Sequence, residues 1–261
     1  MKLEIKNLKF GYGSVPVLKN ISMEVLPGRI TAILGPNAVG KSTLLRCIAG
    51  ILKPRGVILL DGQNISNFNQ EMITKLLSYL SQEGFSRAVL SVFEVVLLGR
   101  IHSLSWNVCN DELNVVWDVL SDMGLCDLAT RYLNELSGGQ KQMVSIAQAL
   151  VREPQVLLMD EPTNNLDIQH QLETLGLIRE LTDSRKITTI VSLHDLDLAA
   201  RYADNLVVLK DGEVYASGKS ESVLTPEMMR DVYGVNARIV VGEDGILQVT
   251  PISSIRSKRS A

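Results

Sequence analysis

Residues 35–43 read GPNAVGKST, a run of the form G-x-x-x-x-G-K-[ST] that suits the binding of a nucleoside triphosphate. Gly35 and Gly40 let the backbone bend so that successive N–H groups point at phosphate oxygens. Lys41 is expected to reach the β and γ phosphates, and Ser42 to offer its hydroxyl to Mg²⁺. The candidate phosphate-contacting residues are Gly35, Pro36, Asn37, Ala38, Val39, Gly40, Lys41, Ser42 and Thr43.

The segments on either side of this loop predict the elements that would position a phosphate. Residues 30–34 are apolar and β-branched, which predicts a buried strand. Residues 41–49, closed by Gly50, predict a short helix with Leu44, Leu45 and Ile48 on one face. A strand, a glycine loop and a helix N-terminus together form an anion site, so an ordinary glycine-rich turn is the weaker interpretation.

A second apolar run, residues 156–159, ends in the acidic pair Asp160 and Glu161. A carboxylate at the end of a strand beside a phosphate loop can hold the hydration shell of Mg²⁺, and its neighbour can accept a proton from the attacking water. We therefore assign Asp160 to the metal and Glu161 to the general base. The alternative is that both acids merely cap the helix predicted to begin near Leu166.

Two further polar residues follow predicted strands at the edge where ligands collect in open α/β sheets. Gln82 follows residues 77–81, and His194 follows residues 190–193 and precedes Asp195. A lone histidine is usually a surface or core residue, but its place at a strand end favours a role in the site. Gln82 by itself carries little information.

Residues 136–140 read LSGGQ and predict a second anion-binding helix N-terminus. Ser137 suits an N-cap, and the paired glycines allow close approach of another backbone. The helix that follows has an apolar stripe and ends before Pro154; its members are Met143, Ile146, Ala147 and Leu150.

Taken in order, these motifs resemble the nucleotide-binding subunit of ATP-binding cassette (ABC) transporters over nearly the whole chain. GPNAVGKST is similar to that family's Walker A motif, VLLMDEP to its Walker B motif, and LSGGQKQ to its signature, the most specific of the three. The resemblance implies that Gln82 is the Q-loop glutamine and a ligand of Mg²⁺, that residues 164–167 are the D-loop, and that His194 is the switch histidine.

The resemblance also implies how ATP is held. Tyr12 would stack on adenine with Val17 beside it, although by composition Tyr12 equally suits a hairpin tip. The signature would close over the ATP of a second copy, giving a two-fold dimer with two sandwiched nucleotides. The signature and D-loop residues implied to contact nucleotide are Ser137, Gly138, Gly139, Gln140 and Asp167. The implied catalytic residues are Glu161, His194, Gln82 and Lys41.

Two positions depart from the commonest family pattern. Ala38 stands where many members have a third glycine, and a positive φ there would cost on the order of 1 kcal/mol. Asn164 replaces a more usual small residue in the D-loop.

The expected fold is α/β: a P-loop NTPase core of mixed sheet flanked by helices, with an N-terminal antiparallel β subdomain and an inserted α-helical subdomain. Residues 1–30 and 56–65 alternate in short runs, residues 85–136 have helical periodicity, and residues 206–217 predict a hairpin around Asp211-Gly212. We expect a single ABC ATPase domain, 1–261, in which 1–84 and 153–261 form the core and 85–152 the helical subdomain with the signature.

Composition limits the possible partners. The net charge of −3 over 261 residues argues against a nucleic-acid partner, and the basic end at Arg256, Lys258 and Arg259 suits a solvated tail. The three cysteines, Cys47, Cys109 and Cys126, suit reduced thiols. No run approaches the ~20 apolar residues of a membrane span, so a membrane role would come through a partner. With no internal repeat, the second ATPase half would be another chain.

The subfamily is less sharply indicated. SVFEVVLLGRIHSL, residues 91–104, and the segment from His194 onward resemble importers of iron–siderophore, haem and cobalamin complexes. The resemblance implies a transmembrane permease, an indirect substrate-binding protein and a peripheral place on the cytoplasmic face of the membrane. The segment could equally be plain core. The alternatives are an exporter or other importer, or a soluble ABC-type ATPase acting on DNA or ribosomes.

Overall fold

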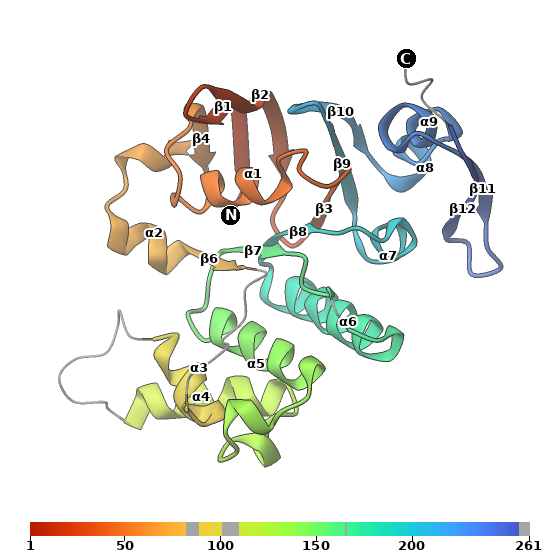
Figure 1. Ribbon diagram of the computed structural model, residues 1–261. Helices are drawn as coiled ribbons and strands as arrows, with labels where there is room; N and C mark the ends of the chain where they lie inside the picture. Colours follow the sequence, from red (N-terminus) through yellow and green to blue (C-terminus); the bar gives the residue numbers. More distant parts are fainter. Residues whose placement is uncertain (82–88, 101–109, 165, 256–261) are drawn as a thin grey trace.

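The structure, a computed structural model, describes residues 1–81, 89–100, 110–164 and 166–255. Within these ranges the strands of one mixed sheet run in the order β5-β4-β1-β2-β10-β9-β3-β8-β7-β6 (Figure 1). Their bounds are β1 Leu3–Tyr12, β2 Val15–Val25, β3 Ile30–Leu34, β4 Arg55–Leu60, β5 Gln63–Asn64, β6 Leu77–Leu80, β7 Val156–Asp160, β8 Thr188–Ser192, β9 Asn205–Lys210 and β10 Glu213–Gly218.

The sheet has two halves that differ in strand direction. Strands β1, β2, β4 and β5 pair antiparallel, whereas β6, β7, β8, β3 and β9 pair parallel. The β9–β10 hairpin turns at Asp211 and Gly212, and β10 joins β2 through the pair Glu213 and Asn20. The predicted mixed core with an antiparallel β region and the predicted hairpin are therefore confirmed.

The central parallel strands β3, β7 and β8 are buried at every position because both faces of the sheet are covered. On β3, Ile33 packs with the helix that follows the phosphate loop, whereas its neighbours Ala32 and Leu34 pack into the opposite core. On β7, Leu158 packs on the same side as Ile33, and Leu157 packs into the opposite core. Because successive side chains of a strand point to opposite faces, this part of the sheet lies between two hydrophobic layers.

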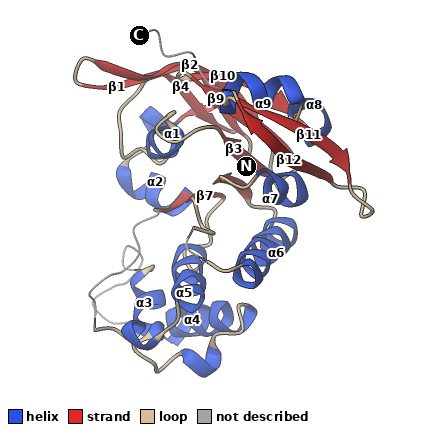
Figure 2. Cartoon of the chain, turned by 45° about the vertical axis from the view of Figure 1, so that its right-hand side comes forward, coloured by secondary structure: helices blue, strands red, loops and turns tan. Residues whose placement is uncertain are grey.

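Helices cover the two faces of the sheet and form a separate lobe (Figure 2). Their bounds are α1 Lys41–Ile48, α2 Gln70–Leu76, α3 Val92–Leu98, α4 Asn110–Asp122, α5 Gly138–Leu150, α6 Ile168–Arg185, α7 Leu196–Tyr202, α8 Ser220–Val223 and α9 Pro226–Tyr233. In the described chain, none of these helices is long and apolar enough to cross a membrane.

The lobe below the sheet in Figure 1 consists of α3, α4 and α5, which pack on one another. The helical periodicity predicts one apolar face made of Leu113, Val116, Trp117, Leu120 and Met123, and of these Val116, Leu120 and Met123 are buried. Trp117, expected on the same face from its spacing, is instead 44% exposed and packs against Phe93 with ring centroids 5.1 Å apart. The lobe shares one hydrophobic core with β7 and α6, and its boundaries at 85 and 152 stay a prediction.

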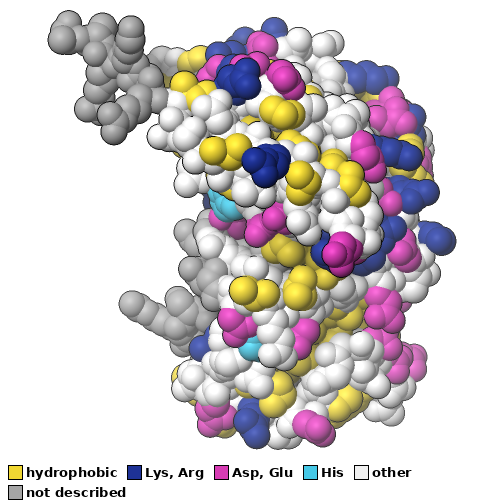
Figure 3. All heavy atoms as spheres, turned by 90° about the vertical axis from the view of Figure 1, so that its right-hand side faces the viewer, with side chains coloured by type: hydrophobic (Ala, Val, Ile, Leu, Met, Phe, Trp, Pro, Cys, Tyr) yellow, Lys and Arg dark blue, Asp and Glu magenta, His cyan; other side chains and the backbone are white. Residues whose placement is uncertain are grey.

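The end of the described chain forms elements that the periodicity did not reveal. After β10 come α8 and α9, then the antiparallel strands β11 (Val235–Val241) and β12 (Leu247–Ser254). The backbone N–H of Val249 donates to Asp197 of α7 at 2.7 Å, and Arg201 pairs with Asp244. Figure 3 shows acidic and basic side chains interspersed on one face of the molecule.

Candidate active site

The phosphate loop connects β3 to α1 and needs unusual backbone angles. Gly35 has φ 142° and Gly40 φ 112°, both in the region that side chains disfavour. A Cβ on Gly35 would lie 2.6 Å from the carbonyl oxygen of Leu209, so the close packing of the loop on β9 also requires glycine. Ala38 has φ 62°, so the position where a third glycine is usual does adopt the left-handed conformation.

Lys41 is the first residue of α1 and is 5% exposed. Its Nζ donates to the carbonyl oxygens of Gly35 at 2.9 Å and Pro36 at 3.3 Å, which holds the ammonium group over the loop. Burial lowers the pKa of Lys41, and the charges of Glu161 and Asp160 oppose that shift. The first turn of α1 contains no acidic residue, so its N-terminal field favours an anion.

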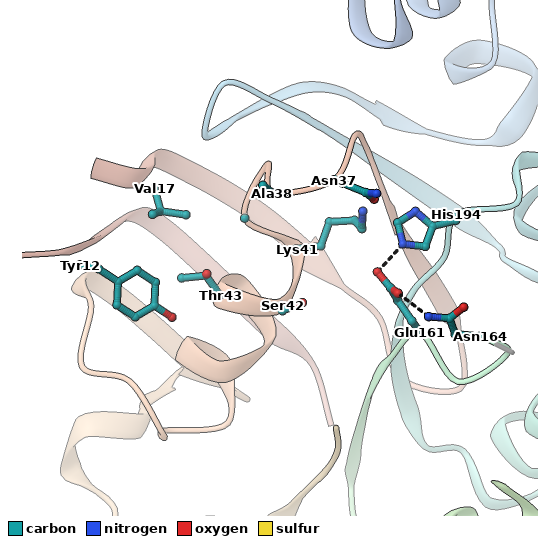
Figure 4. A pocket seen from close by; sticks show the side chains of 11 residues that line it. Tyr12, Val17, Asn37, Ala38, Lys41, Ser42, Thr43, Glu161, Asn164 and His194 are labelled. Atoms are coloured by element: carbon teal, nitrogen blue, oxygen red, sulfur yellow. Dashed lines mark hydrogen bonds and ion pairs between the residues drawn. The ribbon is translucent and has the colours of Figure 1, made fainter. Parts of the chain in front are cut away.

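A cavity of about 670 Å³ opens above this loop (Figure 4). Its walls come from β1, β2, the phosphate loop, the start of α1 and the segments that follow β7 and β8. The lining residues are Tyr12, Val17, Asn37, Ala38, Gly40, Lys41, Ser42, Thr43, Glu161, Asn164 and His194. Tyr12 is 49% exposed, and Phe10 packs edge-on against its ring at 5.1 Å.

Glu161, the predicted general base, lines this cavity. Its backbone is left-handed, with φ 53°, an arrangement that commonly stores strain at functional sites. His194 Nε2 and Glu161 Oε1 are hydrogen-bonded, and Asn164 Nδ2 donates to Oε2 at 3.3 Å. Both carboxylate oxygens are therefore held, and the Asn164 side chain, which the sequence left unexplained, contributes to holding them.

Asp160 lies at the end of β7 and is 2% exposed, so it is not part of the cavity wall. Ser192 Oγ donates to Asp160 Oδ1 at 2.8 Å, and Tyr79 OH donates to Oδ2 at 3.2 Å. Ser192 Oγ also accepts the backbone N–H of Glu161 at 2.9 Å. One hydroxyl thus orients both acids of the predicted pair.

Sequence reasoning missed Ser192 and Tyr79. Asp160 and Ser192 are direct partners in the parallel β7–β8 register, which brings together residues 32 positions apart. The hydroxyl of Ser192, next to the apolar residues Ile190 and Val191 near the end of the predicted strand, was the available signal, and Tyr79 within β6 offered none.

The residues present fit a magnesium ion bound together with nucleotide phosphates. Among the described residues no group of three or more His, Cys, Asp or Glu side chains could hold a metal. Mg²⁺ in nucleotide sites usually keeps several waters and takes one or two protein oxygens in addition to phosphates. The Ser42 hydroxyl in the cavity and the oriented Asp160 carboxylate are suitable oxygens. Gln82, the third predicted ligand, lies outside the described residues.

The signature residues do not reach this cavity in the described chain. Ser137 caps α5 in a capping box with Gln140, whose backbone N–H donates to Ser137 Oγ at 3.2 Å. A Cβ on Gly139 would lie 2.3 Å from the His170 ring, whereas one on Gly138 would meet nothing within 4 Å.

Asp167 also stays outside the cavity wall. It caps α6, accepting the backbone N–H of His170 at 2.9 Å, and it contacts the ring Nδ1 of the same residue at 2.7 Å. The D-loop helix and the signature helix thus meet through His170 within one chain.

Comparison with known proteins gives consistent matches. A family model described as ABC transporter matches residues 18–164. An uncharacterized ABC transporter ATP-binding protein of Methanocaldococcus jannaschii is 46% identical, and the match covers 97% of this chain and 98% of that protein. The petrobactin import ATP-binding protein FpuD of Bacillus anthracis is 38% identical, with 91% and 88% covered.

Solved structures agree with the sequence matches. A chain from the structure of an inward-facing transporter described as metal-chelate type superposes with a TM-score of 0.84 at 26% identity, covering 96% of each chain. The phosphate loop and Glu161 both fall inside the residues that the family model matches. The chain therefore belongs to the ABC transporter family, as an ATP-binding subunit with ATPase activity.

Proposed function

We propose that this cavity binds ATP with Mg²⁺ and that Glu161 is the base of hydrolysis. The main support is that His194 and Asn164 hold the Glu161 carboxylate at the wall of the cavity. A base fixed in this way can take a proton from a water that attacks the γ phosphate. Mg²⁺, when bound, would neutralise phosphate charge, and Lys41 would add a positive charge at the β and γ phosphates.

The remaining contacts to ATP follow from the cavity wall. Tyr12 offers an exposed ring face for adenine, with Val17 beside it. The backbone N–H groups of residues 37–43 surround the phosphates, and the Ser42 hydroxyl is a ligand for Mg²⁺ together with Asp160 and Gln82. His194 stabilises the transition state while it orients Glu161.

A second copy of the chain completes the site. The cavity is open, and the glycines of the signature lie on a helix N-terminus that has no anion partner among the described residues. Ser137 and Gly139 of one copy would close over the ATP of the other, with Gly138, Gln140 and Asp167 at the same interface. This gives a two-fold pair with two sandwiched nucleotides.

The ATPase cycle would drive import of a metal chelate, such as an iron–siderophore, haem or cobalamin complex. The support is the similarity to a petrobactin import protein and to a metal-chelate type transporter. By analogy with these transport systems, the chain would act at the cytoplasmic face of the membrane through a transmembrane permease. A substrate-binding protein would deliver cargo to that permease. No nucleic-acid partner is proposed.

The test is co-purification from membranes followed by reconstitution. We expect a polytopic membrane protein to co-purify with the chain, and ATP-dependent uptake of one chelate class by vesicles containing both. ATP-dependent accumulation of cargo inside inside-out vesicles instead would support the exporter alternative. Recovery with ribosomes or DNA, without a membrane protein, would contradict the transporter assignment.

A further inference from the structure

A second hollow, of about 510 Å³, lies at the tip of the β1–β2 hairpin and shares no lining residue with the ATP cavity. Four cationic side chains line it, Lys9, Lys19, Lys53 and Arg55, and no acidic side chain does. The whole chain has 26 basic and 29 acidic residues, so this cluster is a local departure from the overall balance. A hollow lined by charges of one sign concentrates the opposite charge.

The register of the sheet places two of these cations directly opposite each other. Lys9 of β1 pairs with Arg55 of β4. Cross-strand partners share one face of a sheet, and like charges in that position destabilise it. The fold therefore holds together two charges that repel each other.

The other end of the same strand is built differently. Lys2 lies 3.2 Å from Glu4 and 3.1 Å from Glu24, and Lys6 lies 3.1 Å from Glu4. By contrast, none of the four cations at the hollow forms an ion pair with any residue in the described ranges. Basic residues at the start of β1 are thus paired with acidic residues, whereas those at the hairpin have no counter-charge in the described ranges.

We propose that this hollow binds a ligand with clustered phosphate groups, distinct from the ATP that binds the phosphate loop. Each phosphate monoester carries roughly two negative charges at neutral pH, so two adjacent groups would match four cations. Arg55 can offer a forked pair of N–H donors, while the lysines act as mobile point charges. The chemistry is shared by a soluble polyphosphate and by phosphorylated lipid headgroups.

The hollow also borders the nucleotide site through the hairpin. Residues 13–15 of the turn line the hollow, whereas the preceding residue, Tyr12, lines the ATP cavity. Because a polyphosphate probe would also bind the Walker A loop, the ATP cavity must be filled before the second site is measured.

The experiment uses the full chain saturated with Mg²⁺ and a non-hydrolysable ATP analogue, at low ionic strength. Calorimetric titration with inorganic tripolyphosphate tests a soluble ligand. Co-sedimentation with phosphatidylcholine vesicles containing phosphatidic acid, against phosphatidylcholine alone, tests a lipid headgroup.

The decisive variant is the pair Lys9→Gln and Arg55→Gln, which removes the opposed charges. Its matched control is the double variant Lys2→Gln with Lys6→Gln, which also removes two positive charges but near the other end of β1. We expect the Lys9→Gln, Arg55→Gln variant to weaken binding about tenfold or more for whichever probe the wild type binds. The control should change that binding less than about twofold. The first pair should unfold at no lower a temperature than the wild type, because a repulsion is removed.

Tripolyphosphate binding alone would identify a soluble ligand, and vesicle binding alone a lipid headgroup. Both responses would mean that the site recognises the shared phosphate chemistry. Equal weakening by the two double variants would overturn the proposal in favour of general surface charge. Failure of the wild type to bind either probe would also overturn it.

Discussion

At the residue scale, the hydrolytic chemistry rests on how three neighbours hold Glu161. Glu161 is fixed by His194 and Asn164 at its side chain and by Ser192 at its backbone N–H. These contacts come from the last residue of β8 and from the segments after β7 and β8, and the Glu161 side chain is 12% exposed. The carboxylate is therefore oriented while it still faces the cavity.

The first prediction concerns Glu161→Gln, which keeps the shape of the side chain but removes the base. ATP affinity should be retained, while hydrolysis slows by roughly 10²–10⁴. The ATP-bound pair should then persist and elute as a dimer in size-exclusion chromatography with ATP. Near-normal turnover in this variant would rule out Glu161 as the base.

The second prediction concerns Ser192→Ala, which leaves both Asp160 Oδ1 and the Glu161 N–H without their partner. The apparent Mg²⁺ affinity in ATPase assays should fall about 10–100-fold, the usual effect of losing a residue that orients a metal ligand. Stability should fall by about 1–3 kcal/mol.

The matched control is Ser78→Ala on β6. Ser78 is also buried, and its Oγ donates to the Ala149 carbonyl at 2.8 Å, away from both acids. The Ser78→Ala variant should lose about as much stability as Ser192→Ala, but its apparent Mg²⁺ affinity in ATPase assays should stay at the wild-type value. The same Mg²⁺ response in both variants would show that Ser192 has a purely structural role.

At the element scale, the phosphate loop contains a strained residue. Ala38 adopts φ 62°, where a methyl group is disfavoured and glycine is not. Ala38→Gly should therefore stabilise the chain by about 1 kcal/mol in denaturant unfolding, with ATP affinity retained. Ala200→Gly, within the helix α7, should have the opposite sign, at about 0.5–1 kcal/mol. A destabilised Ala38→Gly variant would contradict this account of the loop.

Helix α3 begins in the segment 91–104 that resembles metal-chelate importers, and we propose that the start of this helix docks the permease. Ser91 caps this helix in a reciprocal box with Glu94, so changing Ser91 would damage the helix itself. Val89 is 75% exposed and two residues earlier, which makes it the cleaner probe.

If this surface docks the permease, Val89→Asp should reduce cargo uptake about tenfold, because a charge buried against a partner costs more than about 1 kcal/mol. ATPase activity of the isolated chain should stay within about twofold. Val241→Asp is the control, since Val241 is 67% exposed on β11. Equal uptake by both variants would place the coupling surface elsewhere.

At the scale of the whole molecule, the last prediction separates ATP binding from pairing of two copies. A Cβ added at Gly138 would meet no atom within 4 Å. Gly138 also lies in the first turn of α5, where an acidic residue is favourable. Gly138→Asp should keep ATP affinity in dilute monomer and abolish the ATP-dependent dimer, even when combined with Glu161→Gln.

Lys41→Ala provides the comparison for this measurement. It should weaken ATP binding itself, about tenfold or more, because the phosphates lose a charged donor. If both variants weakened ATP binding equally in the monomer, the signature would contact nucleotide within one chain and the proposed pairing would be wrong.

Much of the fold and of the motif chemistry could be predicted because it is local. The phosphate loop occupies consecutive residues 35–43, and the runs 30–34, 156–159 and 190–193 are buried strands, as their apolar residues predict. The Asp211-Gly212 hairpin follows from turn residues alone. In these cases neighbouring residues along the chain supply the physical cause.

Other features depended on contacts between distant residues. The partnership of Ser192 with Asp160, and the facing of Lys9 and Arg55, both arise from strand order and register. Trp117 has a core spacing yet is half exposed, because the packing of α3 and α4 decides which side of a helix is covered. Periodicity along a chain specifies which face of an element is apolar, whereas register and packing specify what that face meets. The sequence by itself thus determined the nucleotide chemistry of this protein, and only its tertiary structure decided which groups orient that chemistry.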